Sequence, residues 1–506
     1  MNLGAIGRNI VSNGLGGVWI VFLSLAVIPV QIGILGIEAF GVIGVLAALQ
    51  TVFPLLDLGM CTTLMQRTAT DTAHGHQTAR QLTAGATAVF LSTATAAGLA
   101  LAWKADWLAR HWLQISTLPF DTVVGAIQLI VIAVVIRCPV TVCSALIAGM
   151  NRLDVLNLLR SGVHTLRVLG GLLVLIFYRE LLPLLQWEIA VTVLECAAYL
   201  LACRRLLPGL SLWPRYPADV MRGKWRFALG VNAVAAIGML LTQTDKFAIS
   251  AALPLEALGI YHLAYGATAW ITLIQGGFNS AILPSFAADF ASGRSELLRA
   301  RNAKVTQLTV YAVTLPAAAI LFFGSQILGV WVGHSAASAA ATVAALLSAG
   351  FLLNAAVSNC LTLAVASGNP GIPLRVNLLG LAIYLPALAL LLDLRGITGA
   401  ALAWVILNAY YLAVLVPIVQ RRLLHQGYVA WLRENFLPFV LLGGALFGGA
   451  SAMNNIFAGR PEWLTWCIVV IAAGGYVLGG YFLLARELRA QITASALSLL
   501  RAARPV

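Results

Sequence analysis

Glu38-Ala-Phe-Gly41, a segment between the first two long apolar runs of the chain, recurs 218 residues later as Glu256-Ala-Leu-Gly259. Three further pairs of short segments repeat at offsets of 217 to 219 residues. These pairs are Trp112-Leu with Trp331-Val, Ala148-Gly-Met-Asn151 with Ala366-Ser-Gly-Asn369, and Arg204-Arg-Leu-Leu with Arg421-Arg-Leu-Leu. A nearly constant offset indicates an internal duplication, which predicts a fold built from two similar halves.

The composition indicates that these halves lie in lipid. The chain has 506 residues, of which 60% are hydrophobic and 10% are charged, and its mean hydropathy is +0.92. Soluble domains average about 45–50% apolar and about 25% charged residues. Apolar runs of roughly 20 residues, long enough to cross a bilayer, recur from end to end. Because a lipid-facing backbone must satisfy its own hydrogen bonds, each run is predicted to be a helix.

Fourteen such runs are predicted to span the membrane. The first, from Ser12 to Leu35, is too long for the apolar core of a signal peptide and is followed by no small-residue cleavage site, so we expect it to remain as a helix. The predicted spans cover residues 12–34, 40–64, 83–103, 122–148, 156–178, 184–203, 227–251, 259–286, 306–328, 339–366, 376–392, 397–419, 436–456 and 463–484.

The distribution of Lys and Arg sets the expected orientation, because cytoplasmic loops carry the excess of basic residues. With the N terminus inside, 22 of the 31 basic residues fall in inside segments and 5 fall in outside segments. Both termini are therefore expected in the cytoplasm. The net charge of +13 is then explained by basic loops beside anionic lipid headgroups, and nucleic-acid binding is not expected.

Six spans in each repeat unit give the two units the same orientation, so the predicted lobes are related by an axis along the membrane normal. We expect an N-terminal lobe at residues 1–206, a cytoplasmic linker at 207–226 and a second lobe at 227–424. Residues 425–506 are expected to add two helices and a cytoplasmic tail. A substrate site is expected between the lobes, near the middle of the bilayer.

Several short motifs resemble those of a known group of transporters. The motifs are Leu35-Gly-Ile-Glu-Ala-Phe-Gly41, Asp57-Leu-Gly, Gly149-Met-Asn-Arg-Leu-Asp154, Gln243-Thr-Asp-Lys246, Leu258-Gly-Ile-Tyr261 and Leu328-Gly-Val-Trp-Val-Gly333. Across its first twelve predicted spans the chain is similar to the Wzx-type O-antigen and exopolysaccharide flippases of the multidrug/oligosaccharidyl-lipid/polysaccharide (MOP) exporter superfamily. Those flippases commonly have twelve spans, whereas the lipid II flippases of the superfamily have fourteen.

The resemblance implies an architecture and a function. It implies two six-helix lobes around a central cavity, in the inner membrane of a bacterium. It implies movement of an undecaprenyl-diphosphate-linked oligosaccharide from the cytoplasmic to the periplasmic leaflet by alternating access. It also implies action beside a polysaccharide polymerase and chain-length proteins, without a cofactor.

Charged side chains inside the predicted spans are the candidates for function, because each costs at least about 2.5–3.5 kcal/mol to insert at a helix centre. Arg160, His164 and Arg167 lie at i, i+4 and i+7 of the fifth span, on one helix face. Arg137 lies near mid-depth in the fourth span, and Lys246 lies in the seventh. Arginine offers permanently charged, paired donors that suit a diphosphate. These five residues are predicted to bind the anionic substrate, and Arg167 is the strongest candidate.

Structural roles are alternatives for several of these basic residues. Arg160 lies about one turn inside its span, from where its side chain can reach the headgroups. Arg167 can form a structural ion pair with Glu195 of the sixth span, and Lys246 can pair with the neighbouring Asp245.

Acidic side chains are candidates for ion coupling. The chain has no GxxxxGK[ST] phosphate loop, so a secondary transporter driven by protons or sodium is expected. Asp57, Glu195 and Asp245, together with His164, are the candidate sites. Asp57 has the alternative of holding the turn after the second span, and His164 that of an ordinary packing residue. Glu188 lies near the outer surface and is expected to be solvated.

Two other classes of function fit part of the pattern. A membrane-embedded polysaccharide polymerase or ligase would also handle lipid-linked sugars, but such enzymes carry a large outer loop, and the longest one predicted here runs only from Lys104 to Asp121. No DxD or HExxH pair is present to hold a metal. A drug or metabolite antiporter of the same superfamily would favour an acidic cavity, whereas the fourth and fifth spans carry basic residues.

Overall fold

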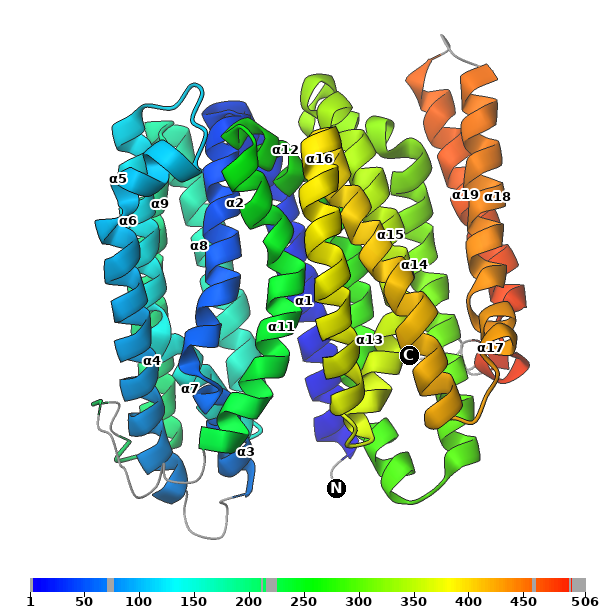
Figure 1. Cartoon of the computed structure of the whole chain (residues 1–506), viewed down its shortest axis with the longest axis horizontal. Coiled ribbons are helices and arrows are strands. Elements are labelled where there is room, and N and C mark those ends of the chain that lie inside the picture. The colour runs from blue at the N-terminus through cyan, green and yellow to red at the C-terminus, as the bar shows by residue number, and fades with distance from the viewer. Residues whose placement is uncertain are drawn as a thin grey trace, which may run out of the picture. The chain divides into compact units, whose positions relative to one another are not determined.

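Every named element of the computed structural model is a helix over the described residues, which are 3–70, 77–210, 213–214, 225–456, 461–490 and 493 (Figure 1). The elements are α1 (Leu3–Leu35), α2 (Ile37–Val52), η1 (Phe53–Asp57), α3 (Met60–Thr70), α4 (Gln77–Trp103), α5 (Ala105–Trp107), η2 (Leu108–Trp112), α6 (Phe120–Ile136), α7 (Cys138–Gly149), α8 (Leu153–Tyr178), α9 (Leu181–Leu206), α11 (Trp225–Ala252), α12 (Leu255–Ala267), α13 (Ala269–Ala291), α14 (Ser295–Val332), α15 (His334–Ala366), α16 (Gly371–Arg422), α17 (Tyr428–Asn435), α18 (Leu437–Ile456) and α19 (Glu462–Leu483). The prediction of an all-helical polytopic membrane protein is confirmed.

The helices that can cross a bilayer are fewer than the fourteen predicted spans. Eleven helices of the described chain are long and apolar enough, or twelve when the bent pair α12 and α13 is taken as one broken span. Within the 52 residues of α16, Gly396 has a φ of 57°, and this break separates the predicted spans 376–392 and 397–419. Helix α11 covers the predicted span 227–251. The number fourteen stays a prediction.

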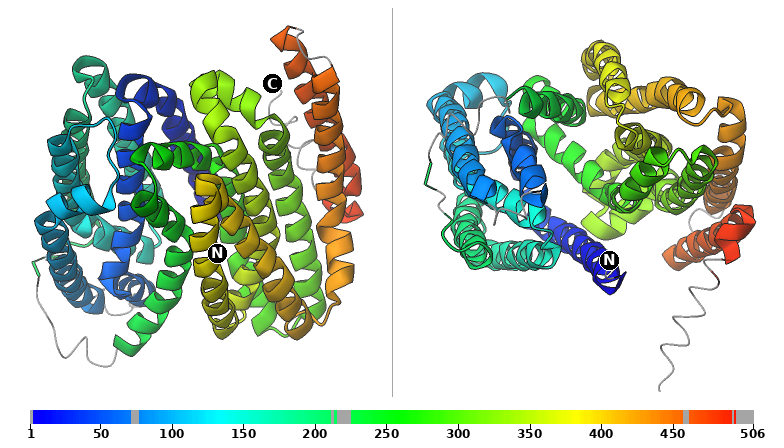
Figure 2. Two further views of the ribbon diagram at one scale, coloured as in Figure 1. Left: turned by 45° about the horizontal axis from the view of Figure 1, so that its top comes forward. Right: turned by 90° about the horizontal axis from the view of Figure 1, so that it is seen from below.

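The chain packs as two compact units, Met1–Leu263 and Ala264–Val506, called unit 1 and unit 2 below. In unit 1, α8 packs against α1 and α9, and α2 contacts α11. In unit 2, α14, α15 and α16 pack in sequence, and α18 lies beside α19 (Figure 2). This division by packing places α11 in unit 1, whereas the duplication assigns it to the second repeat. The predicted lobes at residues 1–206 and 227–424 stay a prediction.

The duplicated segment forms a reciprocal contact inside unit 1. A Cβ atom on Gly41 of α2 would lie 2.4 Å from the carbonyl oxygen of Leu255, and one on Gly259 of α12 would lie 2.1 Å from the carbonyl oxygen of Ile37. Residues 37 and 255, like residues 41 and 259, are equivalent in the repeat. Two equivalent helices therefore cross with their backbones in contact, and only glycine at both positions permits this approach.

A second pair of repeated segments forms the same kind of helix end in each unit. Asn151, two residues after the end of α7, has a left-handed conformation with a φ of 56°, and Gly368, two residues after the end of α15, has a φ of 71°. Each end has the two backbone hydrogen bonds of a Schellman motif. After α7 they run from Arg152 N to Ile147 O and from Asn151 N to Ala148 O. After α15 they run from Asn369 N to Ala364 O and from Gly368 N to Val365 O. The repeated Asn-containing segments are thus helix stops.

Candidate functional site

Two adjacent helices of unit 1, α8 and α9, carry a cluster of charged side chains. Leu158 and Leu173 are exposed on α8, whereas His164 and Arg167 of the same helix contact neighbouring helices. Gly170 brings α9 close, because a Cβ atom there would lie 2.1 Å from the Trp187 ring. The Nε1 of Trp187 donates to the backbone carbonyl oxygen of Arg167 at 3.2 Å. This packing holds the acidic side chains of α9 beside the guanidinium of Arg167.

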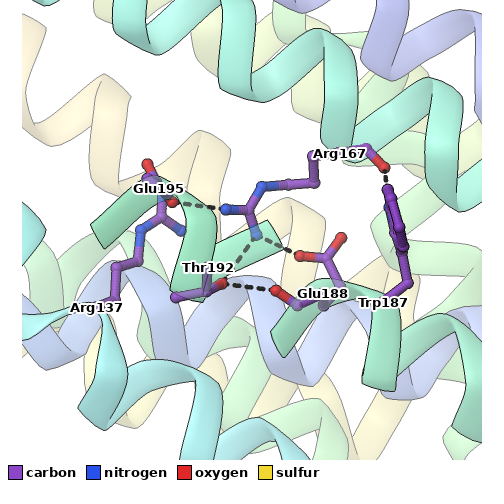
Figure 3. Close-up of polar contacts among 6 residues, drawn as sticks. All are labelled: Arg137, Arg167, Trp187, Glu188, Thr192 and Glu195. Atoms are coloured by element: carbon purple, nitrogen blue, oxygen red, sulfur yellow. Dashed lines mark hydrogen bonds and ion pairs between the residues drawn. The ribbon is translucent and has the colours of Figure 1, made fainter. Parts of the chain in front are cut away.

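Arg167 lies at the centre of the cluster (Figure 3). Its Nη1 pairs with Glu188, and its Nη2 donates to Oε2 of Glu195 at 2.6 Å. Arg137, at the break between α6 and α7, has its Nη2 3.7 Å from Oε1 of Glu195. The hydroxyl of Thr192 donates to the backbone carbonyl oxygen of Glu188 at 2.7 Å. One guanidinium therefore bridges two carboxylates, and one carboxylate bridges two guanidiniums.

The cluster is mostly buried and its formal charges balance. The side chains of Glu195, Arg167 and Glu188 are 6%, 12% and 20% exposed, and that of Arg137 is 39% exposed. Two positive and two negative charges sum to zero, and mutual pairing offsets part of the free energy needed to remove them from water. An external anion would compete with these two carboxylates for the guanidinium of Arg167.

The position of Glu188 corrects the expectation that this residue is solvated. Although it lies near one end of its helix, its side chain is only 20% exposed and pairs with Arg167. Glu188, Thr192 and Glu195 lie at i, i+4 and i+7 of α9, the same spacing as Arg160, His164 and Arg167 on α8. Two helix faces of opposite charge and equal spacing predict a paired interface. This pattern was the available signal for Glu188 in the sequence.

A cavity of about 220 Å³ lies next to Arg167, wholly within unit 1. Its polar lining residues are Ser24, Gln31, His164, Arg167, Glu188 and His262, and the remainder of its wall is apolar. Pockets for drug-sized ligands measure about 300–1,000 Å³, and a water molecule takes about 30 Å³ of liquid volume. The cavity therefore admits about seven waters or a small charged group, and an oligosaccharide is too large for it.

The two histidines of the cavity come from different repeats. His164 Nε2 lies 3.0 Å from Oγ of Ser24 on α1. His262 of α12 packs on Phe40, and its Nδ1 is buried with no hydrogen-bond partner within the described part of the chain. Position 262 is the repeat equivalent of Gly44, and a Cβ atom on Gly44 would lie 3.1 Å from the His262 ring. His262 was not among the predicted site residues, because it has no charged neighbour at helical spacing.

The other predicted site residues lie outside the cluster. Arg160 is exposed on α8 and is close to the hydroxyl of Tyr199. Lys246 and Asp245 of α11 are buried, with Nζ of Lys246 3.6 Å from Oδ1 of Asp245. The hydroxyl of Tyr261 donates to Oδ2 of Asp245 at 2.6 Å. Lys246 and Asp245 thus form a separate pair.

Asp57 lies at the break between η1 and α3. Its two carboxylate oxygens accept hydrogen bonds from the backbone N–H groups of Gly59 at 2.6 Å and Cys61 at 3.0 Å. These are the donors that a residue before a helix normally satisfies. The geometry fits the alternative in which Asp57 holds the turn.

Comparisons with known proteins agree with this architecture. Residues 33–335, more than half of the chain, match the family described as polysaccharide biosynthesis protein. The chain belongs to that family. A protein of Shigella flexneri named "Putative O-antigen transporter" is 21% identical over 388 residues, which cover 75% of this chain and 90% of the relative.

Two solved structures, one of them described as a member of the MOP superfamily, share the fold. The lipid II flippase MurJ in an inward closed conformation has a TM-score of 0.72 at 11% identity, with coverage of 94% of this chain and 98% of MurJ. An inward-facing multidrug transporter of the MATE family has a TM-score of 0.62 at 12% identity, with coverage of 84% and 96%. The predicted membership of the MOP superfamily is confirmed, and the relatives are transporters and flippases, not enzymes.

Proposed function

We propose that the protein moves an undecaprenyl-diphosphate-linked oligosaccharide, an O-antigen or exopolysaccharide repeat unit, across the bacterial inner membrane to the periplasmic leaflet. The family and the named O-antigen relative support this class of substrate. The observation that carries the proposal is the guanidinium of Arg167, which is 12% exposed inside a membrane-spanning bundle and borders a cavity whose wall is apolar apart from a few polar side chains. A cation held at that depth is functional by default.

The diphosphate is the part of the substrate that Arg167 is proposed to bind. A diphosphate diester carries two negative charges and several acceptor oxygens, and it loses its water when it enters the bilayer. Arg167 and Arg137 together offer two charges and paired donors, with His164 beside them. The sugars lie outside the cavity in this proposal, because its volume of about 220 Å³ is too small for them. Arg160 and Lys246 are proposed to act along the path.

Ion coupling is proposed to use the acidic partners of Arg167. When the diphosphate replaces the carboxylates of Glu188 and Glu195, two buried negative charges are added to a cluster whose sum was zero. Uptake of protons by these carboxylates would restore neutrality, which a medium of low dielectric constant favours strongly. Glu195 is therefore the first candidate, and Asp57 and Asp245, each bound by neighbouring groups, are the second.

The first experiment identifies the cargo. In a strain that lacks the protein, a lipid-linked oligosaccharide should accumulate in the cytoplasmic leaflet, and the wild-type chain should restore its export. Absence of any lipid-linked sugar, with a change in drug export instead, would favour an antiporter and contradict the proposal.

The second experiment separates binding from structure at Arg167. Arg167→Lys should lose most export because the planar fork is lost while the charge remains. The triple variant Arg167→Ala, Glu188→Ala and Glu195→Ala removes the guanidinium with both of its partners, and only Arg137, which is 39% exposed, loses its acidic neighbour. It should reach the membrane in normal amounts yet fail to export. Arg152→Lys is the control and should export normally. Arg152 lies just before α8, the helix of Arg167, and the lysine keeps the charge of its exposed ion pair with Asp154. Full export by the triple variant would show that Arg167 is only structural.

A further inference from the structure

A short segment at the end of the outer loop, residues 112–118, joins two repeat-equivalent helices. On one side it binds Glu38 in the first turn of α2. The carboxylate of Glu38 accepts the backbone N–H groups of Ser116 at 2.6 Å, Thr117 at 2.7 Å and Leu118 at 3.2 Å, and the Thr117 hydroxyl as well. Three successive N–H groups that converge on one carboxylate form an anion-binding nest, and such charge-assisted bonds are the strong ones.

On its other side the 112–118 segment binds the junction between α11 and α12. The carbonyl oxygen of Gln114 accepts the backbone N–H of Leu255, the first residue of α12, at 2.9 Å. Nε1 of Trp112 donates to Oγ of Ser250 near the end of α11, also at 2.9 Å. The segment therefore connects the first turns of α2 and α12, which lie side by side in Figure 1.

The two helices that the segment joins also form one end of the cavity. One turn into each helix, Gly41 and Gly259 bring the backbones into contact. Phe40 and His262, which adjoin this contact, line the cavity. The order along the two helices is thus the 112–118 segment, then the glycine crossing, then the cavity.

The arrangement is not a simple product of the duplication. Glu256 is the repeat equivalent of Glu38, and it occupies the same place in the first turn of α12, but it is exposed, whereas Glu38 is 5% exposed. If each carboxylate only stabilised the N-terminal dipole of its helix, we would expect the same exposure in both copies. Only the first copy is buried against the loop.

We propose that the 112–118 segment is a latch that holds α2 and α12 together and closes the cavity on the face that the charge distribution predicts to be periplasmic, with Glu38 as its anchor. Transport by alternating access, on which this inference rests, requires that face to open, so the bonds of Glu38, Gln114 and Trp112 must break in each cycle. The packing of α11 and the start of α12 into unit 1, against the division of the repeat, belongs to the latched state.

Accessibility of the cavity tests the latch without any substrate. A single cysteine at Ile28, which lines the cavity, is placed in a chain whose seven native cysteines are replaced, and a membrane-impermeant thiol reagent is added from the periplasmic side. Glu38→Gln should raise the labelling rate at least about fivefold, since the uncharged amide presents N–H groups to N–H groups. Glu256→Gln is the matched control and should leave the rate unchanged. Thr117→Val removes one hydroxyl only and should give a smaller rise in the labelling rate. It tests the latch even if Glu38→Gln reduces the amount of folded protein.

A reversible cross-link tests whether the latch must open. Gln114 and Pro254 are paired as in adjacent strands, a spacing that suits a disulfide. Gln114→Cys with Pro254→Cys should stop export when oxidised and restore it when reduced. Asn454→Cys with Thr465→Cys, at hydrogen-bonded positions that join α18 and α19 in unit 2, is the control pair and should export in both states.

Three results would overturn the proposal: normal export by the oxidised Gln114–Pro254 pair, no change of labelling in Glu38→Gln and Thr117→Val, or increased labelling from the cytoplasmic side alone. If the proposed cargo is wrong, no lipid-linked sugar should accumulate in a strain that lacks the protein, and the labelling results should be unaffected.

Discussion

The two compact units bury polar side chains of different kinds. Six charged residues of the described chain are buried, and five of them lie in unit 1, namely Glu38, Asp57, Glu195, Asp245 and Lys246. The sixth, Asp289 of unit 2, lies near the end of α13, where it pairs with Arg294 and Arg301. The interior of unit 2 is held instead by neutral amides.

The amides of unit 2 form a chain across three helices. Nε2 of Gln275 on α13 donates to Oδ1 of Asn354 on α15 at 2.6 Å, and Nδ2 of Asn354 donates to Oδ1 of Asn408 on α16 at 2.6 Å. Nδ2 of Asn408 donates to the carbonyl oxygen of Trp404 at 2.8 Å. Such hydrogen bonds between membrane helices contribute about 0.6 kcal/mol on average and need no counter-charge.

The difference indicates a division of roles between the units. An amide network carries no charge that a ligand or a proton could neutralise. A buried ion pair can exchange one partner for a ligand or a proton, and its disruption costs several kcal/mol when no replacement is present. Unit 1 therefore holds the buried charges to which the proposed function assigns the anionic cargo, and the amides of unit 2 are proposed to be a scaffold.

The largest effect is expected at Glu195, the carboxylate shared by two arginines. Glu195→Gln leaves Arg167 with one acidic partner and Arg137 with none, so the cluster gains a net positive charge while buried. We expect a loss of about 3 kcal/mol in the free energy of unfolding. Thermal unfolding in detergent measures it, and an unchanged midpoint would mean that the cluster is solvated, which would remove the contrast between the units.

A smaller effect is expected at Glu188, which binds only one arginine. Its side chain is 20% exposed, and Glu195 continues to pair with Arg167 in its absence. Glu188→Gln should therefore cost about 1 kcal/mol in the same assay. If Glu188→Gln proves as damaging as Glu195→Gln, the bridge between the two arginines is not the source of the stability.

In unit 2, truncation of the central amide should have a modest effect. Asn354→Ala removes the link between Gln275 and Asn408 but leaves no charge unpaired, and we expect a loss of about 1 kcal/mol with export preserved. The export assay and thermal unfolding are measured together. Loss of export in a normally folded Asn354→Ala protein would show that unit 2 contacts the cargo and is more than a scaffold.

The smallest effect is expected at the exposed ion pair between Lys304 and Glu487. Lys304 lowers the pKa of Glu487, so the stability that this pair contributes is present above the ordinary pKa of a glutamate and is lost as the pH falls through the lowered pKa. Glu487 is fully solvated, so Glu487→Gln should leave the unfolding midpoint almost unchanged at neutral pH. A large shift at neutral pH would show that exposed charge, in addition to the neutral amides, stabilises unit 2.

The sequence by itself determined that the chain lies in lipid and is helical, and it predicts the duplication. Hydrophobic runs of bilayer length leave no alternative to helices, because backbone groups in lipid must bond within their own segment. The repeat offset between Gly41 and Gly259 was visible for a similar reason, since close backbone contact admits no other residue. Arg167 was predicted to be the principal cation because insertion of a charge at the middle of a membrane helix costs free energy.

Tertiary structure alone decided which charges meet and which do not. Arg167 pairs with Glu188 as well as Glu195, and Arg160 lies outside the cluster. Glu38 is buried, whereas its repeat equivalent Glu256 is exposed. Helical spacing shows which residues share one face, but the partner of that face depends on the packing and rotation of separate helices. Those are set by contacts such as Trp187 on Gly170 and Gly41 on Gly259, because a glycine admits a neighbour that any larger side chain would exclude.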